Sequence, residues 1–156
     1  MRLKGRTKVE LAKIFAQGSC PMASRLLTLD KHLSEWRVDM LTGPIPNMVG
    51  WPFFHRKQFY PAGHLTSGVA GCNMFFGDTR WGWFSLDDSS TVDEIDKRGV
   101  LFINYDDVCN GSITRRKIID RVRTTNDPNV LIGEFRYFLG IRTFGPYYFS
   151  LTRIEP

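Results

Sequence analysis

The sequence predicts a mainly β protein, built as an antiparallel barrel or sandwich with a short helix near its N-terminus. From Trp36 onward, short apolar runs alternate with turn-forming residues, at the spacing typical of antiparallel barrels and sandwiches. No second long helical pattern separates these runs, which argues against the alternating strands and helices of a parallel sheet. The length of 156 residues corresponds to one domain with a single core. We therefore expect one domain over residues 1–156, with a helical segment over 1–33 and the β structure over 34–156.

The N-terminal segment carries the clearest helical pattern. Apolar residues between positions 7 and 15 fall on one stripe, as expected for a helix that packs one face against a core. Gly18 is expected to end this helix, because glycine readily adopts the left-handed conformation common after a helix. A second helical turn is expected within residues 22–33, with Thr28 or Asp30 as its capping residue.

The rest of the chain supplies the predicted strands, which are bounded by glycine, proline, asparagine and aspartate. The last turn is expected at residues 143–146, where Gly145 and Pro146 interrupt two apolar runs. The predicted strands after Trp36 cover residues 57–59, 70–76, 81–86, 100–105, 112–114 continuing into 117–123, 130–137 and 147–154.

The strand at residues 117–123 indicates what the interior contains. Side chains alternate between the two faces of a strand, so Ile118, Asp120 and Val122 share one face, and Ile119, Arg121 and Arg123 share the other. Each face mixes apolar and charged groups. We expect one face to meet solvent and the other to form an interior with at least one polar residue. A closed barrel of about eight strands can hold one small ligand in such an interior.

The charge and the aromatic content of the chain favour different functions. The formal net charge is +5, and the 12 Phe, 5 Tyr and 4 Trp would allow stacking on nucleic-acid bases. However, the basic residues are scattered, and the densest group, at residues 115–123, is interrupted by Asp120. Many of the aromatic residues fall in predicted strands, where they would line a cavity or pack a core. The aromatic residues therefore favour a small-molecule cavity over nucleic-acid binding.

The chain shows no pattern typical of a secreted or membrane-spanning protein. No apolar run approaches the ~18–20 residues of a membrane helix, and the opening MRLKGRTKVELAKIF lacks the pattern of a secretory signal. Cys20, Cys72 and Cys109 cannot all pair, and they lack a CxxC spacing. These observations predict a cytoplasmic protein with no membrane partner, no cofactor and no bound metal.

Three motifs stand out between residues 10 and 59: ELAKIFAQ, LDKHLSEWRVDMLTG and a later GW followed by KQF. With these motifs, the N-terminal part of the chain resembles the GXWXG-motif proteins. In that family a short helix leads to a Gly-x-Trp-x-Gly strand, a Thr-Gly turn and a later Gly-Trp…Lys-x-Phe segment. Here Ser34 and Val38 flank Trp36 where the family has glycines.

The C-terminal half is similar to the companion lipocalin-like domain of that family, whose function is unknown. The similarity rests on INYDDVCNGSITRRKIIDRVRTTNDPNVLIGEF and on PYYFSLTRI, while residues 61–97 match poorly. The resemblance implies a lipocalin-like (calycin) antiparallel β-barrel with a short N-terminal helix. By analogy with such barrels, Trp36 would plug the base of the barrel and take no part in catalysis.

Acid–base chemistry inside the barrel is the sharpest prediction for a catalytic site, because burial perturbs the pKa of an enclosed group. Asp120 is the first candidate, since its neighbours on the same face are apolar and a buried carboxylate needs a partner. The candidates for such a partner are Tyr105, Arg121, Arg142 and Tyr148. His55 and His64 are further candidates, because they lie in the aromatic-rich segment after Trp51 that would form a lid or mouth.

The expected ligand contacts are aromatic residues, together with arginines that would place an anionic group of the ligand. The alternative for each aromatic residue is that it only packs the core. The candidate contacts are Trp51, Phe75, Trp81, Trp83, Arg121, Tyr137, Arg142 and Tyr148.

The sequence thus predicts a barrel that binds a small hydrophobic molecule, aromatic or terpenoid-like, as a carrier. The alternative is a cofactor-independent enzyme of the isomerase, cyclase or lyase type that uses acid–base residues in the same cavity. A nucleic-acid-binding module is the second alternative. A homodimer is left open as the state of assembly.

Overall fold

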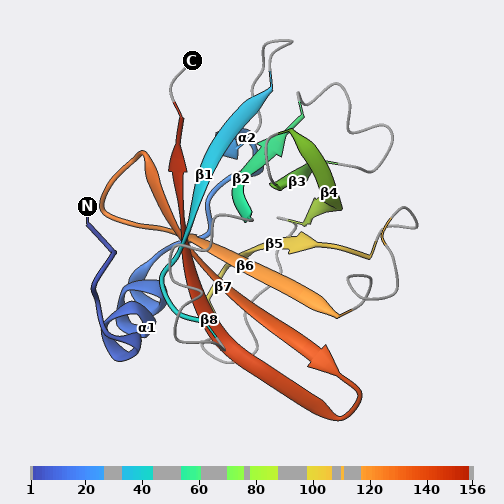
Figure 1. The fold of residues 1–156 in the computed structure, drawn as a ribbon. Helices are drawn as coiled ribbons and strands as arrows, with labels where there is room; N and C mark the ends of the chain where they lie inside the picture. The colour runs from blue at the N-terminus through green and yellow to red at the C-terminus, as the bar shows by residue number, and fades with distance from the viewer. Residues whose placement is uncertain are drawn as a thin grey trace.

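The computed structural model describes residues 2–26, 33–43, 54–60, 70–75, 78–87, 98–106, 110 and 117–154. In these ranges eight antiparallel strands form one closed barrel, in which each strand pairs with the next and the last pairs with the first (Figure 1). The barrel confirms the mainly β prediction, excludes the sandwich and is consistent with a lipocalin-like (calycin) fold. Neither helix in the described ranges is long and apolar enough to cross a membrane.

Two short helices precede the strands, as Figure 1 shows from the blue end of the chain. The expected strand residues 112–114 and the expected caps Thr28 and Asp30 lie outside the described residues. The elements are α1 (Lys8–Gln17), α2 (Ala23–Leu26), β1 (Ser34–Met40), β2 (Phe54–Phe59), β3 (Gly71–Phe75), β4 (Thr79–Asp87), β5 (Leu101–Asn104), β6 (Ile118–Thr124), β7 (Val130–Leu139) and β8 (Arg142–Arg153).

Helix α1 begins with a capping box. The Thr7 hydroxyl accepts a hydrogen bond from the Glu10 backbone N–H, and the Glu10 carboxylate accepts one from the Thr7 backbone N–H at 2.8 Å. This reciprocal pair satisfies two backbone donors at the helix N-terminus. The helix ends at Gly18, which is extended and not left-handed. A Cβ at Gly18 would overlap the Thr124 carbonyl, so this glycine lets the chain approach β6 closely.

The turn expected at residues 143–146 is wrong, because these residues lie inside β8. The chain reverses instead at Gly140, whose φ of +58° lies in the left-handed region that glycine adopts freely. Gly145 lies where the β7–β8 pairing shifts register, so a glycine-proline pair that resembles a turn is accommodated as an irregularity inside a long hairpin.

A large apolar cluster fills much of the barrel interior. Trp36 is fully buried in it, as the expected plug would be, and the Trp36 Nε1–H donates a hydrogen bond to the Ser34 hydroxyl at 3.0 Å. The Phe149 ring occupies the space that a side chain at position 133 would need, so Gly133 allows this ring to lie inside the barrel. Leu26 of α2 also packs on this cluster.

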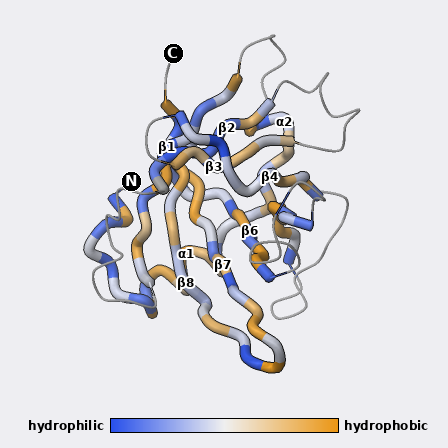
Figure 2. Tube along the Cα trace, turned by 45° about the vertical axis from the view of Figure 1, so that its right-hand side comes forward, coloured by the Kyte–Doolittle hydropathy of each residue, from blue (hydrophilic) through white to orange (hydrophobic). Residues whose placement is uncertain are grey.

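Helix α1 covers part of the outer surface of the barrel. Leu11 and Phe15 from the helix form a second apolar cluster with Ile132 of β7 and Tyr148 of β8. The Phe15 and Tyr148 ring centroids lie 6.2 Å apart. In Figure 2, β6 and β7 carry both hydrophobic and hydrophilic residues without a strict alternation. Both faces of these strands are partly buried, because the barrel interior covers one face and α1 covers part of the other.

Candidate functional site

Four polar side chains meet inside the apolar barrel. Lys57 comes from β2, Asn73 from β3, Tyr105 from the residue after β5, and Asp120 from β6. All four are buried, and Lys57 is fully so. We call these four residues the interior tetrad. A buried lysine and a buried aspartate are rare in proteins unless they are paired.

The tetrad is held by mutual hydrogen bonds. The Lys57 ammonium donates to Asn73 Oδ1 at 2.7 Å, to Asp120 Oδ2 at 3.0 Å and to the Tyr105 hydroxyl oxygen. The Tyr105 hydroxyl donates to Asp120 Oδ2 at 2.8 Å. An ammonium has three N–H donors, so the three acceptors satisfy the hydrogen-bonding capacity of Lys57.

The interior position changes the pKa of Lys57 and of Tyr105. Burial lowers the pKa of Lys57 from its usual 10.5, and the charge of Asp120 opposes this shift. Burial raises the pKa of Tyr105 well above 10, and the neighbouring Asp120 carboxylate raises it further. The Lys57 ammonium lies 5.1 Å from the centroid of the Phe84 ring and 5.8 Å from that of Phe149, so aromatic faces also stabilise its charge.

A bulge at Gly82 shapes one side of the tetrad. Cys72 pairs with Trp83, but the next residue, Asn73, pairs with Trp81, so Gly82 is an extra residue in β4. Its φ of +64° suits glycine, and its carbonyl accepts a hydrogen bond from Asn73 Nδ2 at 3.5 Å. The bulge places Trp81 on the same face as Asn73, whereas a regular strand would put Trp81 beside Trp83.

Aromatic side chains share the interior face with the tetrad. Opposite residues in an antiparallel pair lie on the same face: Trp81 is opposite Asn73, and Phe135 is opposite Asp120. These rings continue toward the end of the barrel where the β3–β4 and β7–β8 hairpins turn, which we call the hairpin end. From the interior-facing aromatic residues that the structure describes at this end, we group five as the aromatic collar: Phe75, Trp81, Phe135, Tyr137 and Tyr147.

The collar rings contact one another but are less buried than the core. The Phe75 and Trp81 ring centroids lie 5.1 Å apart, as do those of Phe135 and Tyr147. Trp81 is 41% exposed, and the other four are half-buried. The Lys8 ammonium of α1 lies 5.9 Å from the Tyr147 ring centroid. Rings that face inward and stay partly accessible offer a contact surface for an apolar molecule.

The structure brings several predicted site residues together. Asp120, the first acid–base candidate, is hydrogen-bonded in the tetrad to Tyr105, another member of the predicted acid–base set. Phe75, Trp81 and Tyr137 lie in the collar beside them. Their roles in binding or catalysis stay predictions, but their proximity is a property of the fold.

Of the predicted residues His55, His64 and Trp51, the structure describes only His55. His55 is half-buried at the start of β2, two residues from Lys57. His64 and Trp51 lie outside the described residues. Among the described residues, no three His, Cys, Asp or Glu side chains gather closely enough to bind a metal ion.

Other predicted ligand contacts lie away from the barrel interior. Arg121 follows Asp120 and so points to the outer face, where it forms an ion pair with Glu134. The Tyr148 hydroxyl also donates to Glu134, at 3.5 Å. The Trp83 ring stacks on the Tyr60 ring. Arg142 is exposed at the β7–β8 turn.

Sequence analysis missed two members of the tetrad, Lys57 and Asn73. A signal was present for each, because strand alternation places Lys57 on the face of the apolar Phe59, and Asn73 interrupts the apolar run GCNMF of β3. A polar residue on an apolar strand face needs a buried partner. The partner itself, Asp120, is 63 residues away from Lys57 in the sequence.

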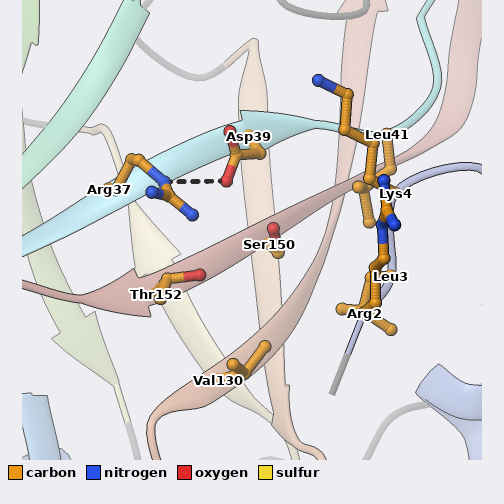
Figure 3. Close-up of a pocket in the computed structure, with 9 residues that line it drawn as sticks. All are labelled: Arg2, Leu3, Lys4, Arg37, Asp39, Leu41, Val130, Ser150 and Thr152. Atoms are coloured by element: carbon orange, nitrogen blue, oxygen red, sulfur yellow. Dashed lines mark hydrogen bonds and ion pairs between the residues drawn. The ribbon is translucent and has the colours of Figure 1, made fainter.

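A separate groove of about 370 Å³ lies on the outer surface. In Figure 3 the N-terminal residues Leu3 and Lys4 lie on one side of this groove, and Ser150 of β8 lies across from them. Arg37 and Asp39 of β1 form an ion pair there with Nε and Oδ2 3.0 Å apart. The lining is largely polar side chains on an exposed surface, so the interior tetrad is the stronger candidate for function.

Comparison with known proteins identifies no relative. The chain matches no protein-family model, no curated protein and no solved structure. The barrel, the interior tetrad and the aromatic collar are therefore the observations from which function is inferred.

Proposed function

We propose that the barrel binds a small hydrophobic molecule, aromatic or terpenoid-like, at its hairpin end. The aromatic collar contacts the apolar part of this molecule, and the interior tetrad faces its polar group. The observation that carries the proposal is the direct juxtaposition of the two groups: Trp81 is opposite Asn73, and Phe135 is opposite Asp120. Binding sites for small molecules combine apolar and aromatic walls with a few placed polar groups in this way.

The free energy needed to bury the charged groups of the tetrad supports a role for them beyond folding. Removing an ammonium and a carboxylate from water costs several kcal/mol per ion, and well-packed apolar residues often stabilise a fold as well or better. Lys57 and Asp120 nevertheless occupy the interior beside half-buried rings. Buried ionisable groups with perturbed pKa values are typical of functional sites.

The fold also supports the resemblance to the GXWXG-motif proteins and their lipocalin-like companion domain. We propose membership of that family on two observations, the closed antiparallel barrel and the burial of Trp36 in its core. The proposal of a small-molecule ligand does not depend on this membership, because it is argued from the tetrad and the collar.

Binding is tested with prodan, a neutral naphthalene dye whose emission shifts to the blue in apolar surroundings. The wild-type protein should give a saturable blue shift. Trp81→Ala should weaken prodan binding about tenfold, because a large ring contact worth roughly 1.5 kcal/mol is lost. Trp83→Ala is the matched control. Trp83 lies in the same strand on the other side of the Gly82 bulge, and its ring packs against Tyr60 outside the barrel.

Equal affinities of the two tryptophan variants would contradict binding at the collar. Saturable binding that only Trp81→Ala weakens would support it. Native mass spectrometry of the purified protein adds an independent measurement, since a tightly held natural ligand would appear as a defined mass increment that organic extraction removes.

A second candidate function is proton-transfer catalysis in the same site. The observation that favours it is the chain of hydrogen bonds from Lys57 and Tyr105 to one oxygen of Asp120. A carboxylate oriented by two donors can take a proton from a bound molecule and return it elsewhere, which is the chemistry of a cofactor-independent isomerase or cyclase.

Catalysis is tested with 2-tetralone, a bicyclic aromatic ketone with acidic C–H groups next to its carbonyl. In D₂O the protein should accelerate exchange of these hydrogens, followed by NMR, and Asp120→Asn should abolish the acceleration. Glu134→Gln, which alters a buried carboxylate outside the barrel, should retain it. Exchange at the buffer rate with wild-type protein would remove the catalytic candidate and leave the binding proposal intact.

A further inference from the structure

One hydrogen-bond acceptor of the interior tetrad, Asp120 Oδ1, receives no hydrogen bond from the described residues. Within the described part of the chain, the hydrogen bonds to the Asp120 side chain both fall on Oδ2, from Lys57 and from Tyr105. The Asp120 side chain keeps 6% of its surface accessible. An ionised carboxylate accepts hydrogen bonds on both oxygens, so Oδ1 is the atom through which the tetrad can receive a ligand.

The donors of the tetrad, in contrast, are occupied within it. The three N–H groups of Lys57 are matched by acceptors on Asn73, Tyr105 and Asp120. The Tyr105 O–H points to Asp120, and the Asn73 amide N–H₂ lies within reach of the Gly82 carbonyl and the Tyr105 oxygen. A ligand carbonyl or carboxylate would have to break one of these bonds before it gained its own.

The charge of the site restricts the ligand further. The Lys57–Asp120 ion pair is neutral as a unit, so the interior offers no net attraction for an ionised group. The Lys8 ammonium, 5.9 Å from the centroid of the Tyr147 ring of the collar, would repel a cationic ligand bound at that ring. Burying a charge without a counter-charge is costly, and a neutral donor group avoids that cost.

We infer that the ligand is a neutral aromatic molecule with a hydroxyl group, and that this hydroxyl donates its hydrogen bond to Asp120 Oδ1. The inference rests on the proposed function and specifies its polar contact. The rings of Trp81 and Phe135 stand directly beside the tetrad, so the hydroxyl is on, or close to, the ring system. Phenols and aryl alcohols have this arrangement.

The inference is tested by isothermal titration calorimetry with four probes that share a naphthalene ring. They are 2-naphthol, 2-methoxynaphthalene, 2-naphthoate and 2-naphthylmethylammonium. A hydrogen bond to a charged acceptor is worth enough to change affinity by about tenfold to a hundredfold. We therefore expect the affinity for 2-naphthol to be at least about tenfold higher than the affinity for each of the other three probes.

Asp120→Asn should remove the preference of 2-naphthol over 2-methoxynaphthalene, and Glu134→Gln should keep it. Because Asp120→Asn leaves the Lys57 charge unpaired and can impair folding, the wild-type probe series is decisive by itself. Equal binding of 2-naphthol and 2-methoxynaphthalene, or tighter binding of naphthoate or the ammonium, would overturn the inference and leave the proposed function standing. Binding of none of the four probes would overturn the proposed function itself.

Discussion

Asp120 and Arg121 are neighbours in β6, yet they belong to two buried charged clusters on opposite sides of the barrel wall. Inside, Asp120 joins Lys57 and Tyr105. Outside, Arg121 pairs with Glu134, which also accepts hydrogen bonds from the Tyr148 hydroxyl at 3.5 Å and from Arg136 Nε at 2.9 Å. The two clusters have similar chemistry, a carboxylate with basic and phenolic donors, but different surroundings.

The outer cluster has a structural purpose that its contacts explain. The Arg121 guanidinium lies 5.7 Å from the Phe15 ring centroid, and the Arg123 guanidinium lies 4.8 Å from it. Arg123 also donates to the Phe15 carbonyl at 3.3 Å, where a positive charge near a helix C-terminus is favourable. The outer charges thus attach α1 to the barrel. The interior tetrad instead joins β2, β3, β6 and the residue after β5, and the aromatic collar beside it is only partly buried.

The largest effect is expected when the interior ion pair loses one partner. Lys57→Met leaves the Asp120 carboxylate buried without its counter-charge, so the free energy of unfolding should fall by about 3–5 kcal/mol. The double variant Lys57→Met, Asp120→Leu should be more stable than the single variant, because no unpaired charge remains. Urea denaturation measures both. A single variant within about 1 kcal/mol of wild type would show that the tetrad is not a tightly coupled pair.

A smaller loss is expected for the outer attachment of α1. Arg123→Met keeps an apolar stem but loses the guanidinium contacts with the Phe15 ring and carbonyl. The free energy of unfolding should therefore fall by about 2 kcal/mol. Backbone amides of α1 should exchange with solvent faster, whereas prodan affinity should stay unchanged. Arg37→Met, at an exposed ion pair with Asp39, is the control and should cost less than about 0.5 kcal/mol. Weaker prodan binding by Arg123→Met would mean that the two clusters are coupled through β6.

The N-terminal cap of α1 should contribute less to the free energy of unfolding than the Arg123 contacts do. Thr7→Ala removes the hydroxyl that accepts from the Glu10 backbone N–H, and loss of such a cap costs about 1 kcal/mol. Thr7→Ser keeps the hydroxyl and should stay near wild type. Thermal unfolding followed by circular dichroism would measure both. If Thr7→Ala matched wild type, α1 would be held by the outer cluster alone.

The smallest effect at neutral pH is expected for the Tyr148 hydroxyl. Burial raises the pKa of Tyr148 to about 12, and the Glu134 charge adds to the shift. The folded state therefore holds this proton more tightly than the unfolded chain does, so the stability it contributes is complete below pH 10 and is lost as the pH rises to 12. Tyr148→Phe should leave the urea midpoint at pH 8 almost unchanged. Between pH 10 and 12, the midpoint of this variant should fall less steeply than that of the wild-type protein. Identical slopes for both proteins between pH 10 and 12 would contradict this assignment.

The local pattern of the sequence predicted α1 and parts of the strands from β2 to β8, but it placed a turn inside β8. The face of β6 that it assigned to solvent is buried at Arg121 and Arg123. Alternation alone places Asp120 and Arg121 on opposite sides of a strand, and the stripe of apolar residues before Gly18 predicts the helix. These are short-range properties, because period and turn chemistry are carried by neighbouring residues. The resemblance to lipocalin-like barrels added the closed architecture that the structure confirms.

Only the tertiary structure decided which residues meet inside. Lys57 and Asp120 are 63 residues apart in the chain, and their contact depends on barrel closure and on strand register. Register shifts such as the bulge at Gly82 move Trp81 to the interior face, and no periodic pattern predicts them. A sequence specifies the face of each strand residue locally, whereas the partner across the barrel follows from the packing of the whole chain.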